Sequence, residues 1–351
     1  MSRYQMVRST LRSSPKTWLV TGAAGFIGSN LVECLLSLNQ IVIGLDDFST
    51  GHRHNLQAVE RAVGSVNWQR FRFIEANICS LNACQDATRG VDYVLHQAAL
   101  GSVPRSIEKP LVSFAANCTG FMTVMTAARE AGVKKFVYAS SSSVYGDSPV
   151  LPKVEEQIGQ PLSPYAATKY LDEVFAQVFA RTYRMACVGL RYFNVYGPRQ
   201  DPEGAYAAVI PKWTASLLRK QPVFINGDGQ TSRDFCYIAN TVQANILAAV
   251  ATDLPQAHEV FNVACGEQTS LLSLFDALRQ GLSEQRGDVA TATPIFGEFR
   301  AGDVRHSLAD IAKARRLLGY EPSHLIKQGL AEAMIWYVRD SERHSKVGVS
   351  C

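Results

Sequence analysis

The stretch VTGAAGFIGSN, residues 20–30, carries a glycine at every third position: Gly22, Gly25 and Gly28. An apolar run, residues 17–21, precedes the glycines, and a helical pattern over residues 26–38 follows them. Glycine permits a tight turn and lets the backbone approach a diphosphate, whose oxygens then face the amides at the helix N-terminus. The stretch therefore predicts a strand, a phosphate-binding turn and a helix.

Further along, short apolar runs alternate with helical patterns. The expected strands are residues 17–21, 41–45, 71–75, 93–96, 136–139 and 186–190. The expected helices lie near residues 26–38, 55–64, 80–89, 110–131 and 164–183. Strands that alternate with helices pair in parallel. The sequence thus predicts an α/β fold with a doubly wound parallel sheet of the Rossmann type.

After residue 191 glycine and proline become frequent and the expected strands, 223–225 and 260–263, are shorter. Helical patterns near residues 206–220, 239–251, 270–282, 309–318 and 325–340 alternate with loops. We expect a smaller α/β domain that binds substrate over the carboxyl ends of the sheet. The predicted division is a Rossmann domain of residues 1–191, to which 235–265 return, and a second domain of residues 192–234 and 266–351.

The composition of the 351 residues is that of a globular protein, with 47% hydrophobic and 19% charged residues. A dispersed formal charge of +4 argues against nucleic acid as a partner. No run of 18 apolar residues predicts a membrane span, and the basic N-terminus, which lacks the apolar core of a signal peptide, is expected to form a short surface helix. Eight scattered cysteines without a metal-ligand pattern predict reduced thiols, no metal and a cytoplasmic enzyme.

An acidic pair ends the second expected strand. Asp46 lies 24 positions after Gly22, where an adenosine ribose presents its hydroxyls. A carboxylate there accepts hydrogen bonds from a free 2′-hydroxyl and repels a 2′-phosphate, which favours NAD over NADP. Asp47 is an equally placed alternative.

The stretch SPYAATK, residues 163–169, places Tyr165 and Lys169 one helical turn apart. A free tyrosine carries little phenolate at neutral pH, and a neighbouring ammonium would stabilise the phenolate electrostatically. Such a pair can move a proton near neutral pH. The alternative is a surface pair without chemistry, which the glycine motif upstream makes less attractive.

Several motifs together resemble the extended short-chain dehydrogenase/reductase family: the glycine motif, HQAA (96–99), SSSSVYGD (140–147), YAATK (165–169), RYFNVYGP (191–198) and AGD (301–303). Within that family the chain resembles nucleotide-sugar 4-epimerases, most of all bacterial UDP-N-acetylglucosamine 4-epimerases, from about residue 16 to 340. The resemblance implies reversible C4 epimerisation of UDP-GlcNAc and UDP-GalNAc through a transient 4-keto sugar, with NAD bound throughout turnover. It also implies a homodimer through helices 110–131 and 164–183, and a role in supplying O-antigen or other surface polysaccharide.

By this resemblance Tyr165 is the base, Lys169 supports it, Ser141 bonds the reacting sugar oxygen and Ser143 lies at the same edge. Ser140 is expected only to cap the end of its strand. The expected cofactor-binding residues are Gly22, Gly25, Phe26, Ile27, Gly28, Asp46, Asp47, Ser49, Thr50, Gly51, Asn77, Ile78, Gln97, Ala98, Ala99, Asn117, Tyr165, Lys169, Tyr192 and Val195. Asn77 stands where relatives often carry aspartate, and Gln97 replaces the commoner asparagine.

The expected substrate-binding residues are Ser102, Ser141, Ser142, Ser143, Tyr165, Asn194, Val209, Lys212, Trp213, Phe224, Asn226, Arg233, Arg300, Asp303 and Ser307. Arg233 and Arg300 suit a diphosphate, because a guanidinium can make two parallel hydrogen bonds to it. The resemblance assigns the uridine ribose to Asp303. Ser307 is small where a tyrosine restricts relatives to plain hexoses, which predicts room for an N-acetyl group.

Four alternatives remain at this stage. A nucleotide-sugar 4,6-dehydratase would need an Asp-Glu pair where this chain has Ser142 and Ser143. A UDP-uronic acid epimerase would need a further cation, and Arg105 keeps that reading open. A UDP-glucose epimerase would share the whole catalytic set. A non-catalytic NAD-binding protein would not need Ser141, Tyr165 and Lys169 together.

Overall fold

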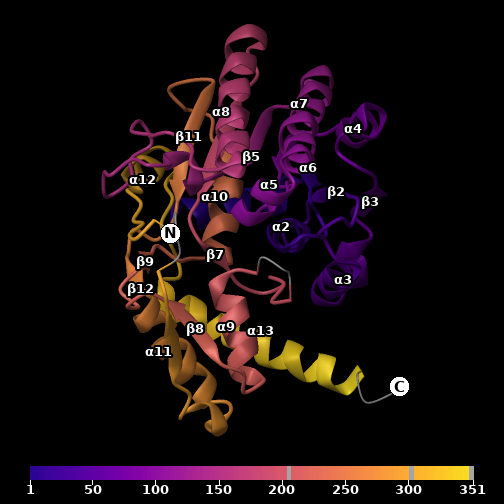
Figure 1. Ribbon diagram of the computed structural model, residues 1–351. Helices are drawn as coiled ribbons and strands as arrows, with labels where there is room; N and C mark the ends of the chain where they lie inside the picture. The colour runs from indigo at the N-terminus through magenta and orange to yellow at the C-terminus, as the bar shows by residue number, and fades with distance from the viewer. Residues whose placement is uncertain (204–206, 300–303, 348–351) are drawn as a thin grey trace.

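A seven-stranded parallel sheet forms the centre of the protein (Figure 1). The structure is a computed structural model that describes residues 1–203, 207–299 and 304–347, with side chains to residue 342. The strands run in the order β11-β6-β5-β4-β1-β2-β3, with the bounds β1 Thr17–Thr21, β2 Ile41–Asp46, β3 Phe71–Glu75, β4 Tyr93–His96, β5 Lys135–Ser141, β6 Cys187–Tyr192 and β11 His258–Val263. All neighbours in this sheet are parallel, which confirms the predicted fold class.

Helices cover both faces of the sheet. Neighbouring residues of β1 point to opposite faces, since Leu19 belongs to one hydrophobic cluster and Val20 to the other. The Val20 cluster contains residues of α2 (Phe26–Ser37), α3 (Arg53–Trp68) and α10 (Ile238–Val250). The Leu19 cluster contains residues of α4 (Leu81–Thr88), α7 (Gly120–Glu130) and α8 (Pro164–Tyr183). The strands other than the edge strand β3 are therefore largely buried on both sides, as their continuous apolar runs predict.

The helix expected over residues 110–131 differs from the prediction in its centre. It consists of α6 (Pro110–Phe114), a π-helical turn over Ala115–Thr119, and α7. Such turns are frequent at functional sites, because they re-aim side chains within a helix. Here the turn carries the buried Asn117, whose side chain bonds both backbone groups of Leu100.

The same stretch is the one run among the described residues that is long and apolar enough to cross a membrane, with a mean hydropathy of 1.4 over Pro110–Glu130. Half of its apolar window is buried inside the protein, as expected for a core helix. This criterion by itself is weak evidence for a membrane span.

The later part of the chain adds a group of elements at the lower end of the molecule in Figure 1, where α9, α11, β8 and α13 lie together. The helices of the later part of the chain are α9 Val209–Leu218, α11 Leu271–Ser283, α12 Ala312–Leu318 and α13 Ile326–Val347, of which α12 lies higher, beside β11 of the main sheet. The strands of this part outside the main sheet are β7 Val195–Tyr196, β8 Val223–Asn226, β9 Ser232–Arg233, β10 Cys236–Tyr237, β12 Thr269–Ser270 and β13 Pro294–Gly297. The short helices are α5 Val103–Glu108 and two 3₁₀ turns, Ser142–Tyr145 and Gly287–Val289. β8 and β13 pair in parallel.

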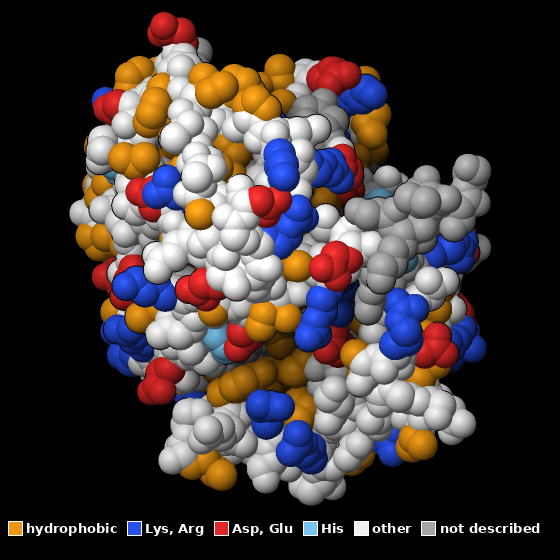
Figure 2. All heavy atoms as spheres, turned by 90° about the horizontal axis from the view of Figure 1, so that it is seen from below, with side chains coloured by type: hydrophobic (Ala, Val, Ile, Leu, Met, Phe, Trp, Pro, Cys, Tyr) orange, Lys and Arg blue, Asp and Glu red, His pale blue; other side chains and the backbone are white. Residues whose placement is uncertain are grey.

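The N-terminus forms the expected surface helix, α1 (Arg3–Ser13). Ser2 and Gln5 form a capping box at its start, and Leu11 is buried against the body. The Gln40 side-chain amide donates to the Leu11 carbonyl (2.7 Å) and ties the helix to the sheet. On the face shown in Figure 2, positive and negative side chains are interspersed rather than gathered by sign.

Candidate active site

The glycine turn lines a cavity of about 760 Å³ at the carboxyl ends of β1 to β4. The predicted cofactor residues that line it are Gly22, Gly25, Phe26, Ile27, Gly28, Asp46, Asp47, Ser49, Thr50, Asn77, Ile78, Gln97, Ala98 and Ala99. The sequence did not single out Ala76, Cys79, Leu100, Gly101, Leu111, Val112, Ala115 and Ala116. The first four adjoin predicted residues, and the others lie on the helical run from residue 110, whose apolar side chains had suggested a subunit contact instead.

The turn has no room for side chains. A Cβ atom on Gly28 would lie 1.9 Å from the Gly22 carbonyl oxygen, and one on Gly22 would lie 2.8 Å from the Ala98 nitrogen. Gly22 also has a φ of +67°, which disfavours other residues. A backbone packed this closely, at the N-terminus of α2, fits a dinucleotide diphosphate.

Two acidic side chains border the cavity and differ in environment. The buried Asp46 carboxylate accepts hydrogen bonds from the amides of Ala24 (2.9 Å) and Phe48 (2.8 Å), and burial raises its pKa. Asp47 accepts from the Asn77 side chain (2.6 Å). Burial raises the pKa of Asp47, but the hydrogen bonds from Ser49 and Asn77 lower it overall. Asp46 thus braces the glycine turn, and both carboxylates remain candidates for the ribose.

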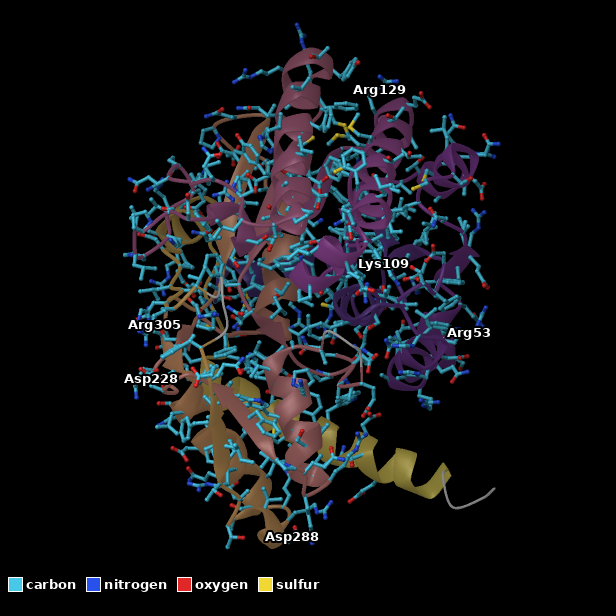
Figure 3. All side chains as sticks on the ribbon, viewed as in Figure 1. Arg53, Lys109, Arg129, Asp228, Asp288 and Arg305 are labelled. Atoms are coloured by element: carbon cyan, nitrogen blue, oxygen red, sulfur yellow. The ribbon has the colours of Figure 1, made fainter. Side chains whose placement is uncertain are left out.

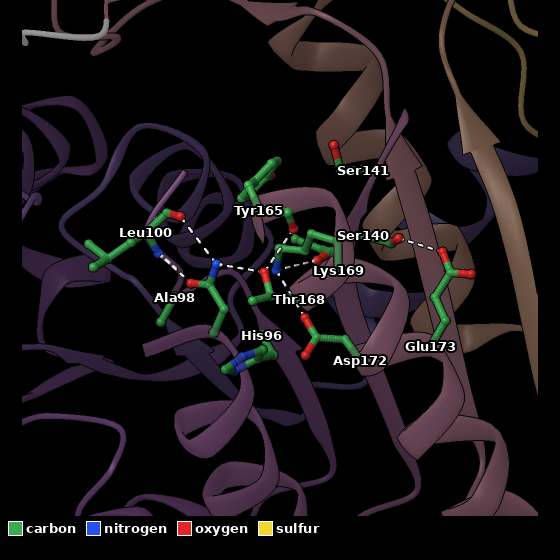
Figure 4. Close-up of polar contacts among 12 residues, drawn as sticks. His96, Ala98, Leu100, Ser140, Ser141, Tyr165, Thr168, Lys169, Asp172 and Glu173 are labelled. Carbon is green, nitrogen blue, oxygen red and sulfur yellow. Dashed lines mark hydrogen bonds and ion pairs between the residues drawn. The ribbon is translucent and has the colours of Figure 1, made fainter. Parts of the chain in front are cut away.

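Tyr165 and Lys169 lie on the first two turns of α8, close to the end of β5 (Figure 4). The buried Lys169 ammonium donates to the Ala139 carbonyl (3.0 Å) and to Asp172 Oδ2 (3.2 Å). Burial lowers the pKa of Lys169, but the charges of Asp172 and Tyr165 raise it overall. Burial raises the pKa of Asp172, against the attraction of Lys169. Lys169 is therefore held in place as a cation beside Tyr165.

The serines at the end of β5 divide into two roles. The Ser143 hydroxyl donates to the Ser141 hydroxyl (2.9 Å), and the Ser143 amide donates to the same oxygen (3.1 Å). Ser141, Ser142 and Ser143 are all partly exposed, whereas Ser140 is buried and donates to a Glu173 carboxylate oxygen (2.5 Å). Ser140 is thus engaged in holding the strand to α8, and the other three are accessible to a ligand.

A second cavity, of about 340 Å³, lies beside α9. The predicted residues that line it are Asn194, Val195, Val209, Lys212, Trp213, Phe224, Asn226 and Arg233. They come from the loop after β6, from α9 and from strands β7, β8 and β9. An aromatic face, two cations and two amides around one cavity can hold a base and a diphosphate. Val195 had been expected at the cofactor.

Ser307 lies next to the strand that carries Arg233. The Ser307 amide donates to the Ser232 carbonyl (3.1 Å), and Ser307 is partly buried. Arg305, two residues earlier, pairs with Asp228 (3.0 Å), and Figure 3 shows these two side chains together at one edge. Arg300 and Asp303, two of the predicted residues, lie outside the described residues.

The remaining predicted residues surround the two cavities. The Tyr192 hydroxyl donates to Gln97 Oε1 (3.0 Å), and the Gln97 amide donates to Asn245 (3.0 Å). Gly51 packs so closely on Ala24 that a Cβ atom would lie 2.9 Å from it. Ser102 caps α5 and has a φ of +110°. Over the described ranges, no three His, Cys, Asp or Glu side chains are grouped so that they could hold a metal ion.

The chain is similar to known proteins over most of its length. A family model described as "NAD dependent epimerase/dehydratase family" matches residues 18–264. The chain is 36% identical over 326 residues to UDP-glucose 4-epimerase of Mycolicibacterium smegmatis, covering 92% of this chain and 99% of that protein.

Two solved structures are similar along nearly their whole length. The UDP-N-acetylglucosamine 4-epimerase of Methanobrevibacter ruminantium, in complex with UDP-N-acetylmuramic acid, has a TM-score of 0.84 and 33% identity, covering 93% of this chain and 99% of that one. The UDP-glucuronic acid 4-epimerase of Bacillus cereus, with UDP-glucuronic acid and NAD, has a TM-score of 0.80 and 31% identity, covering 92% and 99%. These relatives share a reaction type and differ in the sugar.

Proposed function

The chain belongs to the NAD dependent epimerase/dehydratase family, and we propose that it interconverts UDP-GlcNAc and UDP-GalNAc through a transient 4-keto sugar. Its cofactor is NAD, which the crowded glycine turn and the acidic pair fit. The observation that carries the reaction type is the Lys169 cation, which is buried, is held by Ala139 and Asp172, and lies one helical turn from Tyr165. Such an arrangement serves proton transfer rather than binding alone.

In the proposed mechanism the Tyr165 phenol oxygen takes the proton of the sugar 4-hydroxyl and later returns it. Lys169 stabilises the phenolate, and Ser141 donates a hydrogen bond to the reacting sugar oxygen. NAD, when bound, would supply a reversible acceptor for the hydride of the sugar C4. Residues of the 340 Å³ cavity beside α9 hold the UDP while the keto sugar rotates about its link to the diphosphate and presents its other face.

The choice of sugar rests on Ser307. Its side chain is small, is partly buried and lies beside the Arg233 strand, which supports a pocket that accepts an acetamido group. Arg105 favours a second candidate, a UDP-uronic acid, because it lies on α5 beside Ser102 and could pair with a carboxylate. The similarity to the UDP-glucuronic acid 4-epimerase supports the same candidate.

The test is incubation of the purified protein with UDP-GlcNAc, UDP-GalNAc, UDP-glucose and UDP-N-acetylglucosaminuronic acid separately, without added NAD, and identification of products by NMR. We expect C4 epimers of the two N-acetylhexosamines. Tyr165→Phe should lower the rate by about 10²-fold or more, because it removes the proton acceptor. Turnover of the uronic acid alone would favour the second candidate, and unchanged turnover in Tyr165→Phe would overturn the mechanism.

We also propose the domain division expected from the sequence: residues 1–191 with 235–265 for the cofactor, and 192–234 with 266–351 for the UDP-sugar. The pairing of β11 with β6 supports the return of residues 235–265 to the first domain. The position of α9 and β8 around the 340 Å³ cavity supports the second. We place the enzyme in the cytoplasm.

A homodimer through helices 110–131 and 164–183 is a further proposal. Phe114 on α6 and Val178 and Tyr183 on α8 are 47 to 49% exposed. Exposed apolar side chains on neighbouring helices favour contact with a second copy. Light scattering should give twice the chain mass, and a monomer at micromolar concentration would reject the proposal.

A further inference from the structure

One backbone amide in the first turn of α8 donates its hydrogen bond to a distant side chain. The first amides of a helix lack partners within the helix and need them from elsewhere. Pro164 has no amide hydrogen, and the Ser163 hydroxyl accepts from the Ala166 amide (3.1 Å), as in an ordinary cap. The Tyr165 amide instead donates to the Ser106 hydroxyl (3.0 Å), 59 residues away in the sequence. One amide at the start of α8, that of Tyr165, is thus satisfied by a side chain of α5.

Both roles of the Ser106 hydroxyl are taken. Ser106 has no solvent exposure, and its hydroxyl donates to the Val103 carbonyl (2.7 Å) while it accepts from Tyr165. A hydroxyl has one donor hydrogen and two lone pairs, so these two bonds fix its orientation. Removing the oxygen would leave the partly buried Tyr165 amide without this acceptor.

The Tyr165 carbonyl is gripped from the same side. The Thr168 hydroxyl donates to it (2.8 Å) and accepts from Asn117 (3.0 Å), which bonds both backbone groups of Leu100. Figure 4 shows this chain of contacts from Leu100 to Tyr165. The Tyr165 amide is therefore bonded directly to α5, and its carbonyl is linked through Thr168 and Asn117 to Leu100, a residue of the cofactor cavity.

We propose that Ser106 is a positioning residue that fixes Tyr165 relative to residues 97–102, most of which line the 760 Å³ cofactor cavity. This inference rests on the proposed function, in which Tyr165 exchanges a proton with the sugar. Ser106 has no solvent-exposed surface for a ligand to contact, so it acts through the backbone of Tyr165. A shift of about 1 Å in a reacting group can cost about 10²-fold in rate, so the bond matters for turnover more than for binding.

The experiment compares Ser106→Ala with Ser163→Ala in the NAD-loaded enzyme. Both remove one hydroxyl acceptor from the start of α8, so the two variants should have similar midpoints of urea unfolding. Ser106→Ala should lower kcat about ten- to hundred-fold with KM for the UDP-sugar within about two-fold. Ser163→Ala should keep kcat within about two-fold, because the Tyr165 amide retains its acceptor. Ser106→Cys, a similar shape with a weaker acceptor, should give an intermediate kcat.

A second measurement separates positioning from folding. With C4-deuterated UDP-sugar, Ser106→Ala should show a larger isotope effect on kcat than the wild type, because the chemical step has become slower. Equal kcat values for Ser106→Ala and Ser163→Ala, with wild-type isotope effects, would overturn the inference. If the wild type turned over no UDP-sugar, the proposed function would fail; an active wild type that needs Tyr165 but not Ser106 would defeat this inference alone.

Discussion

His96 makes the stability of this protein depend on pH in a way that can be measured separately from its other groups. Its imidazole is 2% exposed, lies 2.9 Å from the Thr21 hydroxyl and packs on the rings of Phe121 and Phe136. Burial and the nearby Lys169 ammonium lower the pKa of His96 to about 3. The folded protein therefore excludes the imidazolium.

The sign and size follow from linkage. Histidine in the unfolded chain titrates near about 6.5, so below that pH the unfolded state binds a proton that the folded state does not. Above pH ~6.5 His96 is neutral in both states and does not reduce the free energy of unfolding. Below that pH the free energy of unfolding falls steadily, until the folded state also binds the proton near the pKa of about 3. Between pH ~7 and ~5 the free energy of unfolding should drop by about 2 kcal/mol through His96 alone.

The assay is urea unfolding of the wild type and His96→Gln at pH values of about 7, 6 and 5. Glutamine keeps a polar group near Thr21 and does not titrate. The wild-type curve by itself is not decisive, since burial raises the pKa of Asp234 to about 6, and a raised carboxyl pKa has the opposite sign. The difference between the two proteins isolates His96, and it should shrink by about 2 kcal/mol.

The control is His52→Gln, at a side chain that is 40% exposed. Because this is a surface substitution, the difference in the free energy of unfolding between the wild type and His52→Gln should change by less than about 0.5 kcal/mol over the same pH range. If the difference between wild type and His96→Gln stayed constant from pH ~7 to ~5, the imidazole would not be excluded from protonation and the argument from burial would be wrong.

Three further predictions concern the cofactor, the core and the sugar. Gly28→Ala should lose copurifying NAD, measured in the extracted nucleotide, because its Cβ would lie 1.9 Å from a carbonyl oxygen, whereas Gly287→Ala, in open space, should keep it. Arg191→Met should lower the free energy of unfolding, measured in urea, by about 3–5 kcal/mol, because it leaves Glu173 buried without its cation. Adding Glu173→Leu should restore much of this loss. A double variant no more stable than Arg191→Met would refute the prediction. Ser307→Tyr should cut turnover of UDP-GlcNAc and spare UDP-glucose in a product assay, and equal losses would contradict the size argument.

The strands could be predicted because their signals are local. Residues 17–21 and 71–75 are apolar or alternating runs bounded by turn residues, and the structure has strands there with the same ends. The same holds for the glycine turn, whose spacing and flanks lie within eleven residues. A cavity that gathers residues next to such motifs is predictable in the same way.

The contacts that orient the candidate site could not be read in this manner. Ser106 and Tyr165 are 59 residues apart, and nothing in the sequence near Ser106 indicates that its hydroxyl meets an amide of α8. The π-helical turn at Asn117 is equally hidden, because a helical pattern has nearly the same period whether or not one extra residue is inserted. Only the fold brings these partners together.

The candidate site thus depends on how α8 is joined to its neighbours. On one side Ser106 and the Asn117 bridge hold the backbone of Tyr165; on the other, Glu173 on the same helix receives Ser140 of β5 (2.5 Å) and two bonds from Arg191 of β6 (2.9 and 2.7 Å). Because Ser140 directly precedes Ser141, these bonds fix the proposed sugar-binding serine relative to the helix that carries Tyr165. A buried ion pair contributes little net stability compared with apolar packing. In the proposed mechanism its value is geometric: the bonds of Glu173 hold the end of β5, which carries Ser141, against α8, which carries Tyr165.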